Sequence, residues 1–254
     1  AYEGLDEIVR QRKLGPDAAH PVNTYRVQKL IGDVACKPGK SFFFTLNQDL
    51  FIERNYYIYS GIRPRPSIPG IQIGEDWFTT NFGGKIGRED IRHVPSAAEL
   101  DARKQEIVAQ SDFFYVKLHG SQNWRSSADA QLMVIGKGKT DQISREPLLA
   151  WYSELFRAVV LQSERRLLVI GYGFRDEHIN NVIADAVANH GLALYVISPV
   201  PYDAFRQDLR AAPAGEVILQ GLSGYYPCGL LEMFPGDQSI TQIYRQLCDT
   251  FLAG

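Results

Sequence analysis

Apolar and β-branched residues gather in short runs that predict buried strands, and helical patterns lie between these runs. Ser41 to Leu46 (SFFFTL) and Phe113 to Leu118 (FFYVKL) are the first two predicted strands. Leu5 to Leu14 and Thr24 to Val34 each predict a helix that stops before a pair of glycine and proline residues. Strands separated by helices are typical of α/β proteins.

The segment between the two predicted strands has a different composition. From Ser60 to His93 prolines and glycines interrupt the hydrophobic pattern, which predicts a loop or lid with little regular structure. Ala97 to Gln110 then predicts a helix, with Ser96 as its N-cap and Glu99 placed for a capping box. We therefore expect residues 60–112 to form an inserted loop and helical lid region.

The clearest unit runs from Arg166 to Pro199. Leu167 to Ile170 is a continuous apolar run, typical of a parallel strand that is covered on both faces. A glycine–tyrosine–glycine turn follows, and Asp176 is placed to cap a helix whose apolar residues recur at helical spacing. Leu192 to Ile197 supplies the next strand. This order of elements defines a βαβ unit, for which we expect a right-handed crossover.

The remaining patterns are helical. Leu148 to Val159 presents a wide apolar helical face, and Ser239 to Phe251 predicts a final helix. Residues 200–254 are therefore expected to form a helical C-terminal extension. We expect residues 1–254 to form a single α/β domain that carries this extension and the insertion.

Composition and charge exclude several classes of protein. Hydrophobic residues make up 45% and charged residues 22% of the chain, which places it among ordinary globular proteins. A net charge of −2 gives no electrostatic reason to expect nucleic-acid binding. No apolar run approaches the roughly 20 residues of a membrane span. The three cysteines form no CxxC pair, which fits a reducing cytoplasm, and we expect a cytoplasmic protein.

Polar or glycine residues stand at the ends of the predicted strands. The first strand runs into Asn47, Gln48 and Asp49, the second into His119-Gly120, and the last into Ser198. Ligands of open parallel sheets bind beyond the carboxyl ends of the strands. If these strands are parallel neighbours, their ends and the glycine turn meet at one crevice.

Each of these residues also has a structural interpretation. Asn47 and Asp49 can form an Asx turn, although on an extended segment both would face the crevice while Gln48 faces away. A histidine at a strand end is often a hydrogen-bonded structural residue. Against that, Gly120 would keep the backbone beside His119 open, and histidine suits proton transfer near neutral pH.

The glycine turn also leaves two interpretations open. It is either a tight connection between strand and helix, or a phosphate-binding turn at the helix N-terminus. Asp176, Glu177 and His178 look like a metal cluster, but successive helical residues point about 100° apart and cannot converge on one ion. We expect no metal site.

Four blocks in this order, FTLNQDLFIE, KLHGSQNW, LLVIGYGFRDEHI and YVISP, carry a family resemblance. They resemble the sirtuin-like domains of bacterial anti-phage defence proteins, which are distant relatives of sirtuin deacylases. The match runs from Phe42 to Pro199 and implies a Rossmann-like parallel sheet with helices on both faces and a smaller insertion. It implies NAD as the substrate. The zinc-binding cysteine quartet of the deacylating sirtuins is missing.

The resemblance also implies roles for single residues. Asn47 would position the ribose of NAD or the attacking water, Asp49 would support Asn47, and His119 would act as the general base. The implied activity is NAD+ glycohydrolysis, which breaks the nicotinamide–ribose bond and depletes NAD in anti-phage defence. The residues expected to bind NAD are Thr45, Leu46, Gly120, Gly171, Tyr172, Gly173, Phe174 and Ser198.

Two other functions remain open, and the second of them rests on the helix-rich C-terminal part as an oligomer surface. One is NAD-dependent protein deacylation, and the other is an assembly module that senses NAD or ADP-ribose without turnover. The family suggests a homo-oligomer or a partner protein, such as a hexameric DNA-translocating ATPase or an Argonaute-type protein. Its glycine-rich phosphate loop, which normally precedes these blocks, is expected upstream of Ala1.

Overall fold

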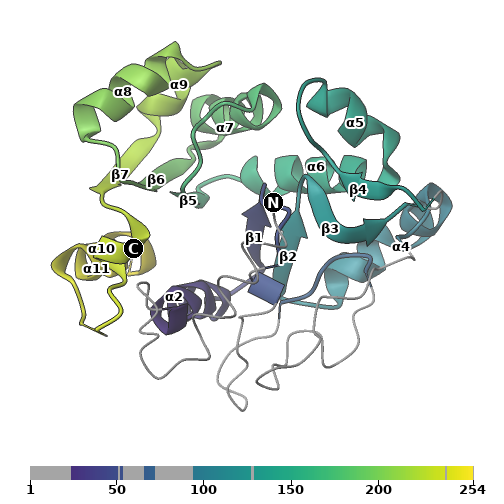
Figure 1. Cartoon of the computed structure of the whole chain (residues 1–254), viewed down its shortest axis with the longest axis horizontal. Coiled ribbons are helices and arrows are strands. Elements are labelled where there is room, and N and C mark those ends of the chain that lie inside the picture. Colours follow the sequence, from purple (N-terminus) through teal and green to yellow (C-terminus); the bar gives the residue numbers. More distant parts are fainter. Residues whose placement is uncertain are drawn as a thin grey trace. The chain divides into compact units, whose positions relative to one another are not determined.

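The computed structural model divides into two compact units, with the boundary between Glu154 and Leu155 inside helix α6 (Pro147–Val160). Figure 1 labels the elements of both units. The predicted helix at Leu5 to Leu14 lies outside the described residues, as does most of the loop predicted at Ser60 to His93. The structure describes residues 24–50, 52–53, 66–71, 94–126, 129–237 and 239–253.

Unit 1 contains the first two predicted strands as a parallel pair. In β1 (Ser41–Thr45) and β2 (Phe113–Lys117), the residues opposite each other run from Ser41 and Phe113 to Thr45 and Lys117. The other edge of β2 exchanges hydrogen bonds with Ser67, whose N–H donates to the Phe113 carbonyl at 2.9 Å. Both strand predictions are confirmed.

Part of the predicted loop belongs to this core. Residues 66–71 have little regular structure, as expected, but Ile68 and Ile71 are only 2% and 6% exposed. Tyr152 on α6 also donates a hydrogen bond to the Pro69 carbonyl at 2.6 Å. These six residues therefore pack against the strands instead of forming a surface lid.

The helices of unit 1 follow the predicted patterns. α2 (Thr24–Ala35) contacts β1, and α4 (Ala97–Ala109) begins at the predicted N-cap, Ser96. The Ser96 hydroxyl accepts the N–H of Glu99, and the Glu99 carboxylate accepts the N–H of Ser96 at 2.8 Å. The predicted capping box is confirmed.

An antiparallel pair that the sequence did not predict follows β2. β3 (Gly120–Arg125) pairs with β4 (Gln131–Met133), and α5 (Lys139–Arg145) comes next. The polar sequence GSQNWR resembles a loop, yet Asn123 is 3% exposed. The Ser121 hydroxyl donates to its side-chain oxygen at 2.9 Å, and such pairing allows polar residues to be buried in a strand.

Unit 2 contains the predicted βαβ unit. β5 (Arg166–Ile170), α7 (Glu177–His190) and β6 (Ala193–Ser198) follow in that order, and the two strands are parallel. Gly191 ends α7 in the left-handed conformation, with φ of 68°. The predicted elements of this unit are therefore present. The expectation that the first strand is covered on both faces is wrong, because β5 is an edge strand in which only Val169 is buried and Ile170 is 40% exposed.

The C-terminal extension is not purely helical. It contributes β7 (Leu222–Pro227), which pairs with β6 in parallel and completes a sheet in the order β5-β6-β7. The final helix, α11 (Gln242–Leu247), starts after Thr241 and continues as a π-helical turn at Cys248–Leu252. The predicted helix is present, but it begins three residues later than Ser239.

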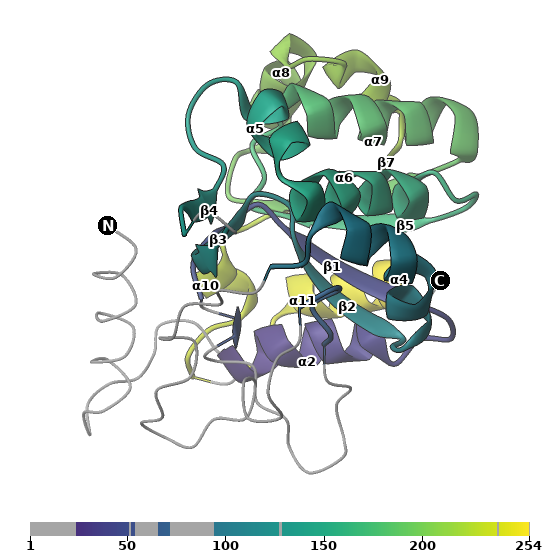
Figure 2. The same ribbon diagram turned by 90° about the vertical axis from the view of Figure 1, so that its right-hand side faces the viewer.

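Helices lie on both sides of this sheet. Figures 1 and 2 both place α7, α8 (Tyr202–Ala211) and α9 (Gly215–Gln220) on one side, with α10 (Leu230–Met233) and α11 on the other. The chain thus has the predicted mixed α/β fold with parallel strands. Within the described part of the chain, no helix is both long and apolar enough to cross a membrane.

Candidate functional site

The predicted site residues fall into two groups, one in each unit. The first stands at the carboxyl ends of β1 and β2, and the second at the carboxyl ends of β5 and β6. The first comprises Thr45, Leu46, Asn47, Asp49, His119 and Gly120. The second comprises Gly171, Tyr172, Gly173, Phe174 and Ser198.

The segment after β1 points alternate side chains outward and inward. Asn47 is exposed, its N–H donates to the Thr45 hydroxyl at 3.0 Å, and its side-chain amide bonds to no described residue. Gln48 is only 4% exposed, and its amide donates to the carbonyls of His119 at 3.1 Å and Val134 at 2.6 Å. Among the described residues, the Asn47 amide therefore has no partner, while Gln48 holds its segment to the end of β2.

A fully buried ion pair lies behind this segment. Lys117 and Glu53 both have side chains that are 0% exposed, and Lys117 Nζ lies 2.7 Å from Glu53 Oε1. Lys117 Nζ also donates to the Asp49 carbonyl, and the Tyr115 hydroxyl donates to Glu53 Oε2 at 3.3 Å. A side chain from β2 thus holds the backbone that follows Asn47.

Burial sets the titration of this cluster. Loss of hydration raises the pKa of the Glu53 carboxyl above its ordinary value of 4.5, although the neighbouring Lys117 charge opposes that shift. Burial, together with the Glu53 charge, raises the pKa of the Tyr115 hydroxyl well above 10.0. Tyr115 therefore remains a neutral hydrogen-bond donor to Glu53.

His119 and Gly120 are enclosed by β4. His119 is 4% exposed, and its carbonyl accepts the N–H of Val134 at 3.0 Å. Gly120 has φ of 76°, and a Cβ there would lie 2.1 Å from the Leu132 carbonyl oxygen. The prediction that Gly120 keeps the backbone beside His119 open is wrong. The glycine is needed because β4 approaches so closely.

The glycine turn of unit 2 is braced by its own helix. Asn180 on α7 is 0% exposed and donates to the carbonyls of Phe174 at 2.8 Å and Pro213 at 3.0 Å. The Tyr172 hydroxyl donates to Asn180 Oδ1 at 2.8 Å, and burial raises the pKa of this hydroxyl. The Phe174 ring is 2% exposed and packs against Phe205, so its side chain belongs to the core and not to a ligand surface.

The start of α7 differs from the prediction in one respect. Asp176 is the N-cap residue, but its side chain caps no N–H of the helix, and its own N–H donates to the Tyr172 hydroxyl at 3.2 Å.

The Gly171 N–H donates to the Ile197 carbonyl at 3.4 Å, which brings the turn beside Ser198. The structure therefore joins the second group of predicted residues at one edge of this sheet.

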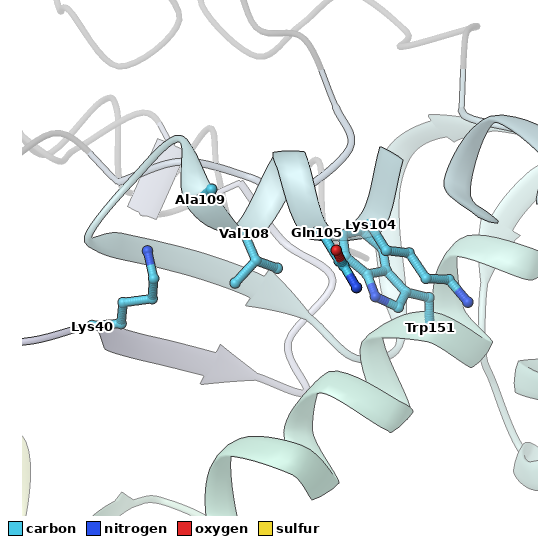
Figure 3. Close-up of a pocket in the computed structure, with 6 residues that line it drawn as sticks. All are labelled: Lys40, Lys104, Gln105, Val108, Ala109 and Trp151. Atoms are coloured by element: carbon cyan, nitrogen blue, oxygen red, sulfur yellow. The ribbon is translucent and has the colours of Figure 1, made fainter. Parts of the chain in front are cut away.

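A shallow pocket of about 440 Å³ in unit 1 lies away from these residues (Figure 3). It stands at the opposite end of β1 from Asn47, between Lys40, α4 and Trp151. Lys40 donates to the Ser111 carbonyl at 2.7 Å, and Lys104 pairs with Asp101 at 3.1 Å, so both cations on its rim have partners. We do not assign the predicted chemistry to this pocket.

A second pocket, in unit 2, lies next to Ser198. Its volume is about 360 Å³, and its walls include Tyr202, Tyr225 and Pro227. Pro227 is opposite Ser198 in the pairing of β6 and β7. Over the described ranges, no group of three or more His, Cys, Asp or Glu side chains could hold a metal ion.

Fold and strand ends together define an α/β protein of the kind that binds ligands at the carboxyl edge of parallel strands. The family model for the SIR2-like domain matches residues 41–216, which is more than half of the chain, and the protein belongs to this family. The match includes all the predicted site residues. Members of the family are NAD-dependent enzymes, so membership implies NAD binding. A search of curated proteins gave no match.

The roles of Gln48, Glu53 and Lys117 were not predicted, although all three lie within the blocks that carry the resemblance. A signal was present: Lys117 ends the apolar run FFYVK, and Glu53 follows the apolar run LFI. Lone opposite charges in two apolar runs indicate a buried pair, because an unpaired charge is rarely buried.

Proposed function

We propose that the protein is an NAD+ glycohydrolase that cleaves the nicotinamide–ribose bond. Water adds its oxygen to C1′ of the ribose, the electron pair of the broken C–N bond stays with nicotinamide, and one proton is released with ADP-ribose. The main support for this proposal is the exposed Asn47 amide, which has no partner among the described residues. The segment that carries it is held by hydrogen bonds at Gln48 and Asp49. A reaction through an oxocarbenium-like transition state depends on such positioning.

The strand register supports joint action of Asn47 and His119. Thr45 pairs with Lys117, and each candidate residue stands two positions beyond its member of that pair. In the proposed reaction Asn47 holds the ribose or the attacking water, and His119 accepts the proton of that water. Asp49 supports Asn47 through the backbone that Lys117 holds.

Considered by itself, unit 2 has a pocket of the kind that binds an adenosine. Tyr202 and Tyr225 have ring centroids 5.3 Å apart, and both line the pocket next to Ser198. Aromatic side chains bind a flat base by stacking, and the Ser198 hydroxyl is a hydrogen-bonding group of the kind that binds ribose. We propose that Gly171 and Gly173 lie along the phosphates.

The test is NAD consumption with product analysis. The full-length protein should release nicotinamide and ADP-ribose, and Asn47→Ala should lower the rate about 100-fold or more because positioning is lost. His119→Ala should lower it by roughly 10² to 10⁴, as expected for a general base. Asn189→Ala and His190→Ala on α7 are matched controls that should keep the wild-type rate.

The same experiment distinguishes NAD hydrolysis from the two other functions. Turnover only with an acyl-lysine peptide, giving an O-acyl-ADP-ribose, would instead identify a deacylase. Tight binding of NAD that stays intact in every assembly state and with every candidate partner would contradict the proposal and identify a sensing module. A role in anti-phage defence, with an oligomer or a partner protein as activator, remains a prediction.

A further inference from the structure

Two side chains cross between the ends of β1 and β2 in opposite directions. Gln48, from the segment after β1, donates to the carbonyl of His119 at 3.1 Å. Lys117, from the end of β2, donates to the carbonyl of Asp49. The exchange joins the two segments that carry Asn47 and His119.

We propose that Gln48 and Lys117 form a reciprocal clamp that fixes Asn47 relative to His119, with Glu53 as the counter-ion of Lys117. The two clamp residues are then positioning residues for NAD cleavage, an inference that rests on the proposed function. Neither side chain has to touch the substrate.

The clamp acts where the sheet no longer does. The paired residues of β1 and β2 end at Thr45 and Lys117, and one further backbone bond joins Leu118 N–H to the Thr45 carbonyl at 3.0 Å. Beyond that point the Gln122 N–H donates to the Gln48 carbonyl at 3.0 Å. Gln48 thus binds the segment after β2 through both its carbonyl and its side chain.

Stability of the fold alone does not account for the ion pair. Burying two charges removes their hydration, and an apolar set of similar volume often serves a core equally well or better. The pair of Lys117 and Glu53 is nevertheless fully buried, unlike surface pairs such as Arg103 and Glu106. An apolar side chain could not donate to the Asp49 carbonyl, which is the contact that orients the segment.

The variant that tests the clamp most directly replaces Lys117, Glu53 and Tyr115 together by apolar residues. Lys117→Met combined with Glu53→Leu and Tyr115→Phe removes the clamp without leaving a buried charge. Lys117→Met alone would leave Glu53 unpaired and can fail to fold. Gln48→Met tests the other half of the clamp with a side chain of similar length.

Hydrogen exchange and kinetics are measured on each folded variant. We expect the amides of Asn47 and Gln122 to exchange about tenfold faster or more, while amides of α4 keep their rates. We expect kcat to fall about 100-fold, with KM for NAD changed by less than about threefold, because misplacement affects the chemical step. Leu100→Ala, a core substitution on α4, is the control for general destabilisation and should keep kcat per folded molecule.

The two readouts separate failure of the clamp from failure of the proposed function. Unchanged exchange at both amides in the clamp variants, or faster exchange with unchanged kcat, would overturn the clamp as a positioning device. A wild-type protein that leaves NAD intact would overturn the proposed function, and the exchange data would still decide whether the clamp exists.

Discussion

The strand ends of the two units are held in different ways. In unit 1, Gln48 reaches a carbonyl 71 residues away and Lys117 one 68 residues away, and a buried ion pair takes part. In unit 2, Asn180 bonds Tyr172 and Phe174, which lie eight and six residues before it, and these groups are uncharged. The strand ends of unit 1 are held by distant parts of the chain, and those of unit 2 mainly by their own turn and helix.

This difference indicates what each region tolerates. A local turn keeps most of its contacts when distant elements move, because its partners belong to the same short segment. A clamp between distant segments fails when either segment shifts, and its buried charges make that failure severe. We therefore expect larger losses from substitutions in unit 1.

Lys117→Met should have the largest effect. It leaves the Glu53 carboxylate buried without its cation, which we expect to lower the free energy of unfolding by about 3–5 kcal/mol. Urea unfolding measures the loss. Arg157→Met, which breaks the exposed pair with Asp185 in unit 2, is the control. A similar loss in both variants would contradict the comparison.

The two glycines at the strand ends give the next test. Gly120→Ala brings a Cβ to 2.1 Å from a backbone oxygen of β4, so strain and overpacking should lower the unfolding free energy by about 3 kcal/mol. In Gly171→Ala the new Cβ meets no atom within 4 Å, so only the left-handed backbone conformation opposes the substitution. The unfolding free energy should therefore fall by about 1–2 kcal/mol. Thermal unfolding of both variants gives the order, and the reverse order would show that β4 moves aside readily.

Asn180→Ala should have an intermediate effect in unit 2. It removes the donor to the Phe174 and Pro213 carbonyls, which we expect to lower the unfolding free energy by about 2 kcal/mol. Asn189→Ala on the exposed face of the same helix should change it by about 0.5 kcal/mol or less. Chemical denaturation compares the two. Equal values would mean that the turn is held by its backbone alone.

The smallest effect concerns pH, and its sign differs between the units. Burial raises the pKa of Glu53 above 4.5, so its proton stabilises the folded state at low pH, and this contribution is lost as pH rises through the raised pKa. A hydrogen bond from Asn189, aided by Arg157, lowers the pKa of Asp185 below 3.8. Its contribution is present above that value and is lost as pH falls through the lowered pKa.

Unfolding of wild type, Glu53→Gln and Asp185→Asn across pH 3 to 7 checks these signs. Relative to its variant, the wild type should lose stability with rising pH in the first comparison and gain it in the second. If the stability difference between wild type and variant changed with pH in the same direction in both comparisons, the causes assigned to the two pKa shifts would be wrong.

Sequence analysis predicted the elements that depend on nearby residues. The strand from Leu167, the stop at Gly191 and the capping box of Ser96 and Glu99 all follow from patterns within one element, and all are confirmed. The exposure of Asn47 beside a buried Gln48 follows from the alternation of an extended segment.

The missed features depend on distant partners. The buried strand β3 has a polar sequence, and only its contacts in the fold make it a strand. The sequence does not predict β7, because Gly224 interrupts a short run that becomes a strand by pairing with β6. The surroundings of Gly120 could not be predicted from nearby residues, because the segment that fills them lies 12 residues later, at Leu132.

The exposed amide of Asn47 has a consequence for how this protein can evolve. No described residue bonds to that amide, so another small polar residue at position 47 would leave the fold and the clamp intact. Under the proposed function, a single codon change there would abolish turnover without unfolding the protein. The scaffold could then persist under selection for a role that needs no reaction.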